Sequence, residues 1–174
     1  MSETTRQHEV WLRGPVDGVD PLLMPVAHAL LQAREDLARL AATVSPVHAW
    51  DRPGGAASIG FHVRHLGGTI DRLFTYARGE ALTDAQKQAL RSETSSPVPP
   101  PALTAVIDET TATIDRAVAE LRTLSRDRLL EPRHVGRLGL PSNVIGLLFH
   151  AAEHTTRHVG QAITTARILG GRSE

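Results

Sequence analysis

The stretch PSNVIGLLFHAAEHTTRHVGQAITTARILGG, residues 141–171, carries a long helical periodicity. On a helical wheel of about 100° per residue, its apolar side chains gather on one side, centred on Ala151. This stripe comprises Val144, Leu147, Leu148, Ala162, Ala166 and Leu169. Pro141 and Ser142 precede the segment and the glycine pair 170–171 follows it, as is typical of helix ends. Because such a helix must bury its stripe against other elements, we expect it to be part of a helical bundle.

Three further segments show the same period. The first begins at the cap Asp20 and ends at Pro46, the second runs from Ser58 to about Ala77, and the third begins beyond the proline run 99–101. No stretch shows the alternation that is typical of a strand. We therefore predict an all-α fold, a four-helix bundle in which each helix buries one stripe.

The link between the second and third helices, from Arg78 to Pro101, constrains the topology. A helix of roughly 20 residues spans about 30 Å, and a link of this length can run back along it. The second and third helices are then parallel, which predicts an up-down-down-up order with a long crossover. The link also contains TDAQKQALRSE, residues 83–93, which is compatible with a short extra helix.

Length and composition exclude several classes of protein. The 174 residues suit a single domain, 1–174, with the bundle at about 20–171 and an N-terminal arm at 1–19. The 19 basic and 19 acidic residues balance, and only six residues are Trp, Tyr or Phe, so we expect no nucleic-acid partner. The sequence shows no signal-peptide pattern and no apolar run long enough to cross a bilayer. We expect a cytoplasmic protein without a membrane partner.

Histidines mark the candidate site on the last helix. From the centre of the stripe, His158 lies about 20° away, His154 about 60° and His150 about 100°. His154 and His158 are four residues apart, so their rings stack on one face of the helix and can share one ion. Each buried imidazole otherwise needs its own hydrogen-bond partners, such as a carbonyl or a hydroxyl group. Both interpretations remain open on spacing alone.

A third imidazole is available on the second helix, in FHVRHLGG, residues 61–68. His62 lies nearer the apolar stripe of that helix, whereas His65 falls at its edge. Since cysteine is absent, any metal ion must be held by imidazole or carboxylate groups. Periodicity thus leaves two candidates for the third ligand and mildly favours His62.

The motifs RHLGGTIDRL, residues 64–73, and HTTRHVGQAITTARILGG, residues 154–171, resemble those of the DinB/YfiT-like family of metalloenzymes. The shared features are a histidine followed by an aliphatic residue on helix two, then H-x-x-x-H followed by x-G-Q and a terminal Leu-Gly on helix four. The resemblance extends from about residue 22 to residue 171. It implies a four-helix bundle with a three-histidine metal site.

Carried over by position, the resemblance implies that His65, His154 and His158 are the metal ligands. The resemblance therefore favours His65 as the third ligand, whereas periodicity favours His62. The glycine pair 67–68 would let the helices approach closely, which is compatible with His65 as the ligand. Thr155 departs from the family, in which an acidic residue often follows the first histidine of the pair. His62 and His150 are expected as neighbours in the pocket.

Two other metal motifs deserve comparison. Residues 150–154 spell H-x-x-E-H, the inverzincin protease signature, in which the glutamate acts as base. Glu153 points away from the stripe, however, and only Glu174 follows as an acidic ligand, so this reading is disfavoured. A di-iron site requires several inward carboxylates, which the stripes lack. The sequence therefore favours a site for one metal ion over a site for two.

Three neutral imidazoles leave the charge of a divalent ion intact and a coordination position open. The resemblance implies a small-thiol-dependent S-transferase or a hydrolase acting on a small molecule, and relatives use bacillithiol, mycothiol or glutathione. Zinc or nickel is the expected ion, and iron or copper also suits imidazole ligands. The alternative is a non-catalytic metal-binding or stress-response module whose histidine triad is structural or vestigial.

Two further expectations concern the surroundings of the site. The loop before the last helix is expected at the mouth of the site, and its carboxylate-binding candidates are Arg133, His134 and Arg137. The favoured alternative is that these three are ordinary solvated charges of a loop. We place the larger aromatic residues in the core by default, namely Trp11, Trp50 and Phe61. The heptad-like spacing of the first helix is compatible with a homodimer.

Overall fold

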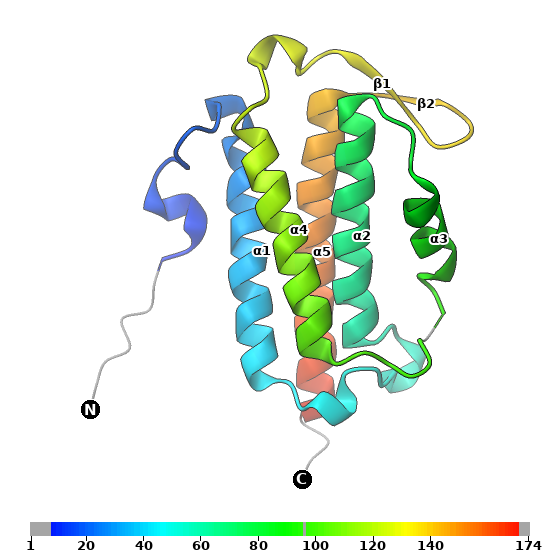
Figure 1. Ribbon diagram of the computed structural model, residues 1–174. Helices are drawn as coiled ribbons and strands as arrows, with labels where there is room; N and C mark the ends of the chain where they lie inside the picture. The colour runs from blue at the N-terminus through cyan, green and yellow to red at the C-terminus, as the bar shows by residue number, and fades with distance from the viewer. Residues whose placement is uncertain (1–7, 96, 171–174) are drawn as a thin grey trace.

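The computed structural model describes residues 8–95 and 97–170 (Figure 1). Four long helices pack side by side, α1 (Met24–Thr43), α2 (Ile59–Arg78), α4 (Leu103–Leu121) and α5 (Val144–Gly170), and the short α3 (Asp84–Ser92) lies outside α2. The predicted four-helix bundle and the predicted extra helix are both confirmed.

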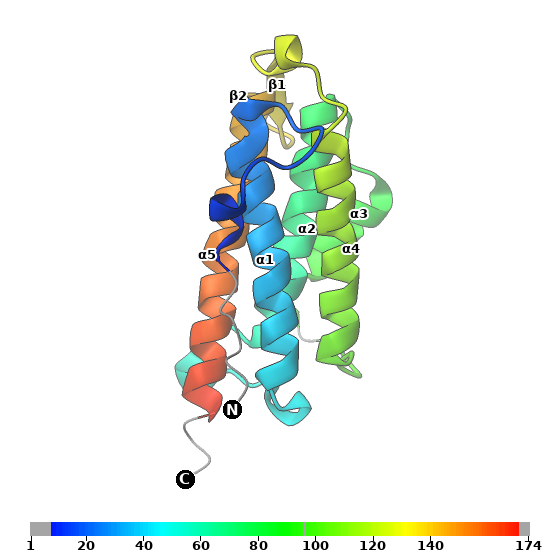
Figure 2. The same ribbon diagram turned by 90° about the vertical axis from the view of Figure 1, so that its left-hand side faces the viewer.

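The order of the helices confirms the predicted topology. In Figure 1, α1 and α5 run downward, whereas α2 and α4 both run upward. The crossover that contains α3 descends beside α2, which is why α2 and α4 are parallel. Both α2 and α1 contact α4 and α5, so the four helices enclose one core (Figure 2).

Two of the predicted helix starts have side-chain caps. Ser58 Oγ accepts a hydrogen bond of 3.1 Å from the backbone N–H of Phe61 at the start of α2. Asp20 Oδ1 accepts one of 2.9 Å from Leu22, in a single 3-10 turn, Pro21–Leu23, that leads into α1. These caps satisfy N–H groups that lack a partner within the helix.

The core follows the predicted stripes. The largest fully buried side chains come from all four long helices and their ends, and include Leu23, Leu30, Leu37, Ile59, Leu66, Ile70, Ile114, Leu121 and Leu148. Helices α2 and α4 approach closely at Gly67, where a Cβ atom would lie 2.8 Å from Thr110 Oγ1. The Thr110 hydroxyl in turn donates to the carbonyl of Val63 (3.2 Å). A glycine is required at this contact.

The segment between α4 and α5 adds a small hairpin to the predicted helical fold, and the sequence did not predict this hairpin. There, β1 (Pro132–Val135) pairs antiparallel with β2 (Leu140–Asn143) in a small hairpin. Gly136 and Gly139 adopt positive φ angles of 68° and 59° in its turn, a conformation that favours glycine. Both strands are four residues long and bury none of their side chains, so they carry no apolar alternation that would reveal them in the sequence.

The aromatic residues divide between surface and interior. Trp11 is 60% exposed, so its predicted place in the core is wrong. Trp50 and Phe61 are half-buried, and the Trp50 indole donates to the carbonyl of Pro101 (2.9 Å). Within the described residues, no helix is both long and apolar enough to span a membrane.

Candidate metal centre

Three histidines from two antiparallel helices converge in the structure. His65 comes from α2, and His154 and His158 come from α5. One ring nitrogen of each lies within 4.8 Å of the others. The ring centroids are 4.4 Å apart for His154 and His158, 4.5 Å for His65 and His158, and 5.0 Å for His65 and His154. The three rings thus surround one small volume.

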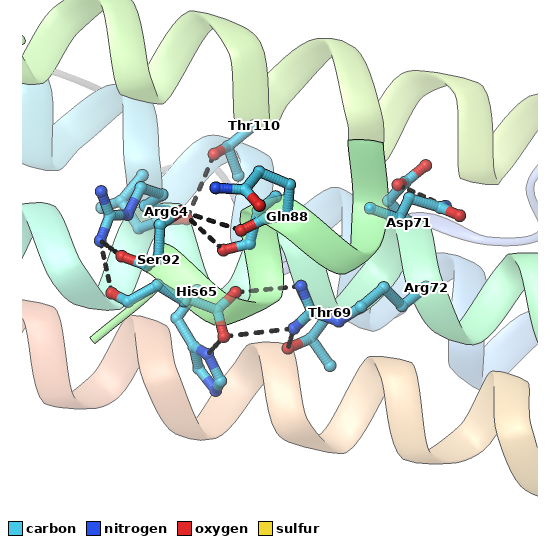
Figure 3. A network of polar contacts seen from close by, with 12 residues as sticks. Arg64, His65, Thr69, Asp71, Arg72, Gln88, Ser92 and Thr110 are labelled. Atoms are coloured by element: carbon cyan, nitrogen blue, oxygen red, sulfur yellow. Dashed lines mark hydrogen bonds and ion pairs between the residues drawn. The ribbon is translucent and has the colours of Figure 1, made fainter. Parts of the chain in front are cut away.

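His65 is oriented by a buried carboxylate. Its Nδ1 lies 2.8 Å from Glu93 Oε2, and Glu93 is only 6% exposed. Figure 3 shows the His65 ring at one end of this network and Arg72 and Thr69 at the other. When Nδ1 of His65 carries the proton, this N–H donates to the carboxylate and Nε2 is left free as the ligand atom. Proteins orient metal-binding histidines by this arrangement.

Arg72 keeps Glu93 ionised. Its Nη1 donates to Glu93 Oε1 (3.1 Å) and its Nη2 to Thr69 Oγ1 (3.2 Å). Burial raises the pKa of Glu93, but the hydrogen bond from His65 and the charge of Arg72 outweigh it, so the pKa is lowered overall. The carboxylate therefore carries its negative charge beside the histidine cluster.

His62 supports the cluster from the interior. Its Nδ1 lies 3.0 Å from Nδ1 of His158, and the side chain is buried. Burial lowers the pKa of His62, and the nearby charge of His65 lowers it further, so His62 is neutral. The Nδ1 of a neutral His62 can accept a hydrogen bond from the Nδ1–H of His158, which leaves Nε2 of His158 free as a ligand atom.

His154 carries a polar atom without a partner. Its Nδ1 is buried and makes no hydrogen bond within the described residues. Burial, followed by the charge of His65, lowers the pKa of His154 and of His158 to about 4 in each case. Both rings are therefore neutral at neutral pH and offer lone pairs to a cation. The unsatisfied nitrogen and the all-imidazole donor set fit a divalent ion.

The comparison with protein families agrees with this geometry. The model of the DinB superfamily matches residues 29–162. The chain belongs to the DinB superfamily. The matched range includes all three clustered histidines. No curated protein shows significant similarity to the chain.

The departure at Thr155 from the DinB/YfiT-like pattern has a counterpart in the structure. The Thr155 hydroxyl is buried and donates to the carbonyl of Ala151 (2.7 Å) in its own helix. It is therefore not hydrogen-bonded to a histidine ring. In this DinB superfamily chain, Glu93 on the crossover provides the carboxylate that reaches the cluster. Sequence reasoning missed Glu93 because no period or motif marks one acidic residue in an exposed segment.

Other predicted residues lie around the cluster. His150 is exposed at its rim, with its Nδ1 2.7 Å from Glu153 Oε1 and its ring edge-on to His154 at 5.5 Å. Glu153 also accepts a hydrogen bond from Arg157 (2.6 Å), so the glutamate of the protease signature contacts His150 and Arg157, whereas His154 belongs to the histidine cluster. Glu174 lies outside the described residues.

The remaining candidates lie on the hairpin. Arg133, His134 and Arg137 line a pocket together with α3 and the end of α2, and no clustered histidine lines that pocket. The structure thus places them at another site and not at the mouth of the histidine cluster. Phe61, in contrast, stacks on His65 with ring centroids 5.3 Å apart and planes inclined by 8°, and so forms a wall of the site.

Proposed function

We propose that this DinB superfamily chain is a metal-dependent enzyme in which His65, His154 and His158 bind one divalent ion. The proposed reaction is a small-thiol-dependent S-transfer, or a hydrolysis, on a small-molecule substrate. Zinc or nickel is the proposed ion, and iron or copper also suits the site. The observation that carries the proposal is the convergence of three imidazole nitrogens within 4.8 Å.

The donor set supports an ion with a free coordination position. Three protein ligands with one open position are typical of catalytic zinc sites, whereas structural sites are closed by four. When bound in such a site, a divalent ion lowers the pKa of a water or thiol that joins it. Because the chain has no cysteine, a thiol nucleophile must come from a small molecule.

The chain's own residues fix the ligands in place. Glu93 holds the ring of His65 from one side through its 2.8 Å hydrogen bond, and Phe61 stacks on its face. His62 holds His158 from the interior. Ligands locked by such contacts keep their geometry when a substrate binds, which favours catalysis over loose metal storage.

A thiol-dependence assay tests this proposal. Zinc- or nickel-loaded protein is mixed with glutathione, bacillithiol or mycothiol, and the thiolate is followed by its ultraviolet absorbance across a pH series. We expect the apparent pKa of at least one thiol to fall with loaded protein. It should not fall with metal-free protein or with the His154→Ala variant.

Turnover of an electrophile such as monochlorobimane then separates the two reaction types. An adduct that forms faster only with thiol and loaded protein supports S-transfer, whereas turnover of an ester substrate without thiol supports hydrolysis. A bound ion that changes neither the thiol pKa nor any turnover would contradict the enzyme proposal and would favour the non-catalytic binding module.

A further inference from the structure

The pocket lined by Arg133, His134 and Arg137 lies at the upper end of the bundle, between the end of α2, helix α3 and the hairpin. In Figure 1 the hairpin of β1 and β2 extends outward above α3. The pocket has a volume of about 860 Å³. Cavities of this size commonly hold small molecules. Tyr76, on its wall, is three helical turns from His65 along α2, roughly 16 Å.

Both walls of this pocket are held by polar contacts. Arg133 Nε donates to the carbonyl of Ala77 (2.7 Å) and ties the hairpin to the end of α2. Gln86 Nε2 donates to Asp71 Oδ2 (2.7 Å) and to Thr75 Oγ1 (2.8 Å), which ties the start of α3 to α2. The pocket is therefore preformed and does not need a ligand to assemble it.

The lining of the pocket carries more basic than acidic side chains. Its one acidic side chain is Glu80, and its basic side chains are Lys87, Arg91, Arg133 and Arg137. Outside the lining, Glu80 pairs with Arg78 (2.9 Å), Lys87 with Asp84 (3.1 Å) and Arg133 with Glu131 (2.7 Å). Among the described residues, Arg91 and Arg137 are therefore the lining cations without a carboxylate partner. In the part of the chain that the structure describes, the Arg137 side chain makes no hydrogen bond or ion pair, and Arg91 donates only to the amide of Gln88 (2.7 Å).

Apolar side chains complete the pocket. Helix α3 buries none of its own residues, and Leu90 on its pocket side is 45% exposed. Leu82 and Tyr76 line the same space and are half-buried. Apolar surface left open inside a pocket favours a ligand with an apolar body, and free guanidinium groups beside it favour a carboxylate or phosphate.

We propose that this pocket binds a small organic anion, a carboxylate or phosphate carried on an apolar body. Arg91 and Arg137 bind the anionic group, and Leu82, Leu90 and Tyr76 contact the apolar part. The site is separate from the histidine cluster, so its occupancy does not depend on a metal ion.

The only tyrosine of the chain gives a local probe of this site. Protein labelled with fluorotyrosine shows one fluorine NMR signal from Tyr76, which is titrated with naphthoate, naphthyl phosphate and the neutral naphthalenemethanol. We expect a saturable shift with at least one anion and a much weaker response to the alcohol. The anion that binds more tightly identifies the preferred charged group.

Variants assign the binding to the two arginines. The Arg91→Gln/Arg137→Gln protein should bind the preferred anion roughly tenfold more weakly or worse, because charged hydrogen bonds are lost. Arg167→Gln, which removes an exposed charge on α5, should bind like the wild type. Chelator-treated protein and His154→Ala should also bind like the wild type, which keeps this test independent of the proposed metal function. No saturable shift, equal binding of the alcohol, or wild-type affinity in the double variant would overturn the proposal.

Discussion

At the scale of single residues, Glu93 connects the histidine cluster to the interior of the bundle. It contacts His65 through one carboxylate oxygen, and the Arg72 guanidinium lies 3.1 Å from the other. Arg64 secures the backbone here by donating to the carbonyls of Ser92 (3.3 Å) and Glu93 (Figure 3). The orientation of His65, one of the proposed metal ligands, thus depends on a residue that lies outside the bundle helices.

Replacing this carboxylate should weaken metal binding without removing a ligand. Glu93→Gln keeps the shape of the side chain but loses the charge that orients His65, and we expect the affinity for zinc or nickel to fall about 10- to 100-fold. Isothermal titration measures the change. Glu80→Gln, an exposed substitution, is the matched control, and a folded Glu93→Gln protein with wild-type affinity would argue against this role.

The same network affects stability, because Glu93→Gln also leaves Arg72 without its counter-charge. Breaking a buried ion pair on one side typically costs about 3–5 kcal/mol of unfolding free energy. Arg72→Met breaks the same pair while keeping the carboxylate on His65. Its metal affinity should therefore fall less than that of Glu93→Gln, which separates orientation of the ligand from general destabilisation.

The two neutral histidines of α5 predict a pH dependence for the metal-free protein. Burial lowers the pKa of His154 and His158 from 6.5 to about 4 in the folded state. Above pH 6.5 neither state binds these protons, and below it the unfolded chain takes them up while the folded chain does not. The unfolding free energy should therefore decrease as the pH falls from about 6.5 towards 4.

Urea unfolding at a series of pH values measures this loss. A His154→Gln/His158→Gln variant retains polar side chains that do not titrate, so its unfolding free energy should fall less steeply over the same window. Identical slopes for the variant and the wild type would show that these two histidines are not held neutral by the fold.

Residue patterns predicted the clustered pair on α5 but not the histidine that joins it from α2. Periodicity measures burial, and His62 is indeed more deeply buried than His65, at 6% exposed. The three clustered histidines are only half-buried, since they face one another across two helices. Only the family resemblance pointed to His65, since a wheel drawn for one helix does not show how its partner is rotated.

At the scale of elements, glycines set how closely the helices pack. A Cβ atom at Gly67 would lie 2.8 Å from Thr110 Oγ1. The Thr110 side chain is β-branched, and its hydroxyl is hydrogen-bonded to the carbonyl of Val63 on α2. At Gly160 on α5, a Cβ atom would meet no other atom within 4 Å. The two positions therefore offer a matched pair of substitutions.

The two substitutions should change the unfolding free energy in opposite directions. Gly67→Ala should lower the unfolding free energy by about 1–3 kcal/mol, since α2 and α4 must move apart. Gly160→Ala should raise it by about 0.5–1 kcal/mol, because alanine favours a helix interior without new contacts. Urea unfolding measures both, and equal tolerance at the two positions would contradict the close approach of α2 and α4.

The elements differ in how far the sequence predicted them. The long helices and α3 follow from apolar periodicity, capping residues and prolines, which act locally. The hairpin was not predictable because its four-residue strands bury no side chain and therefore carry no apolar stripe. Trp11 was misplaced because size alone does not bury a residue that lies ahead of the bundle, on a short 3-10 turn at Val10–Arg13.

At the scale of the whole molecule, the crossover determines what the bundle can hold. Because it runs back along α2, it brings Glu93 beside His65 and places α3 opposite the hairpin. The parallel order of α2 and α4 was predictable from link length alone. The polar contacts that this route creates were not, since they join residues far apart in the sequence.

The most direct test of the proposed metal site is the metal content of untagged protein, measured by elemental analysis after exposure to zinc or nickel. A site formed by His65, His154 and His158 predicts one ion per chain, which is lost when any of the three is replaced by alanine. In His62→Ala the ion should be retained with weaker affinity. An ion that stays in His65→Ala but is lost from His62→Ala, or a wild-type protein that binds none, would contradict the proposed site.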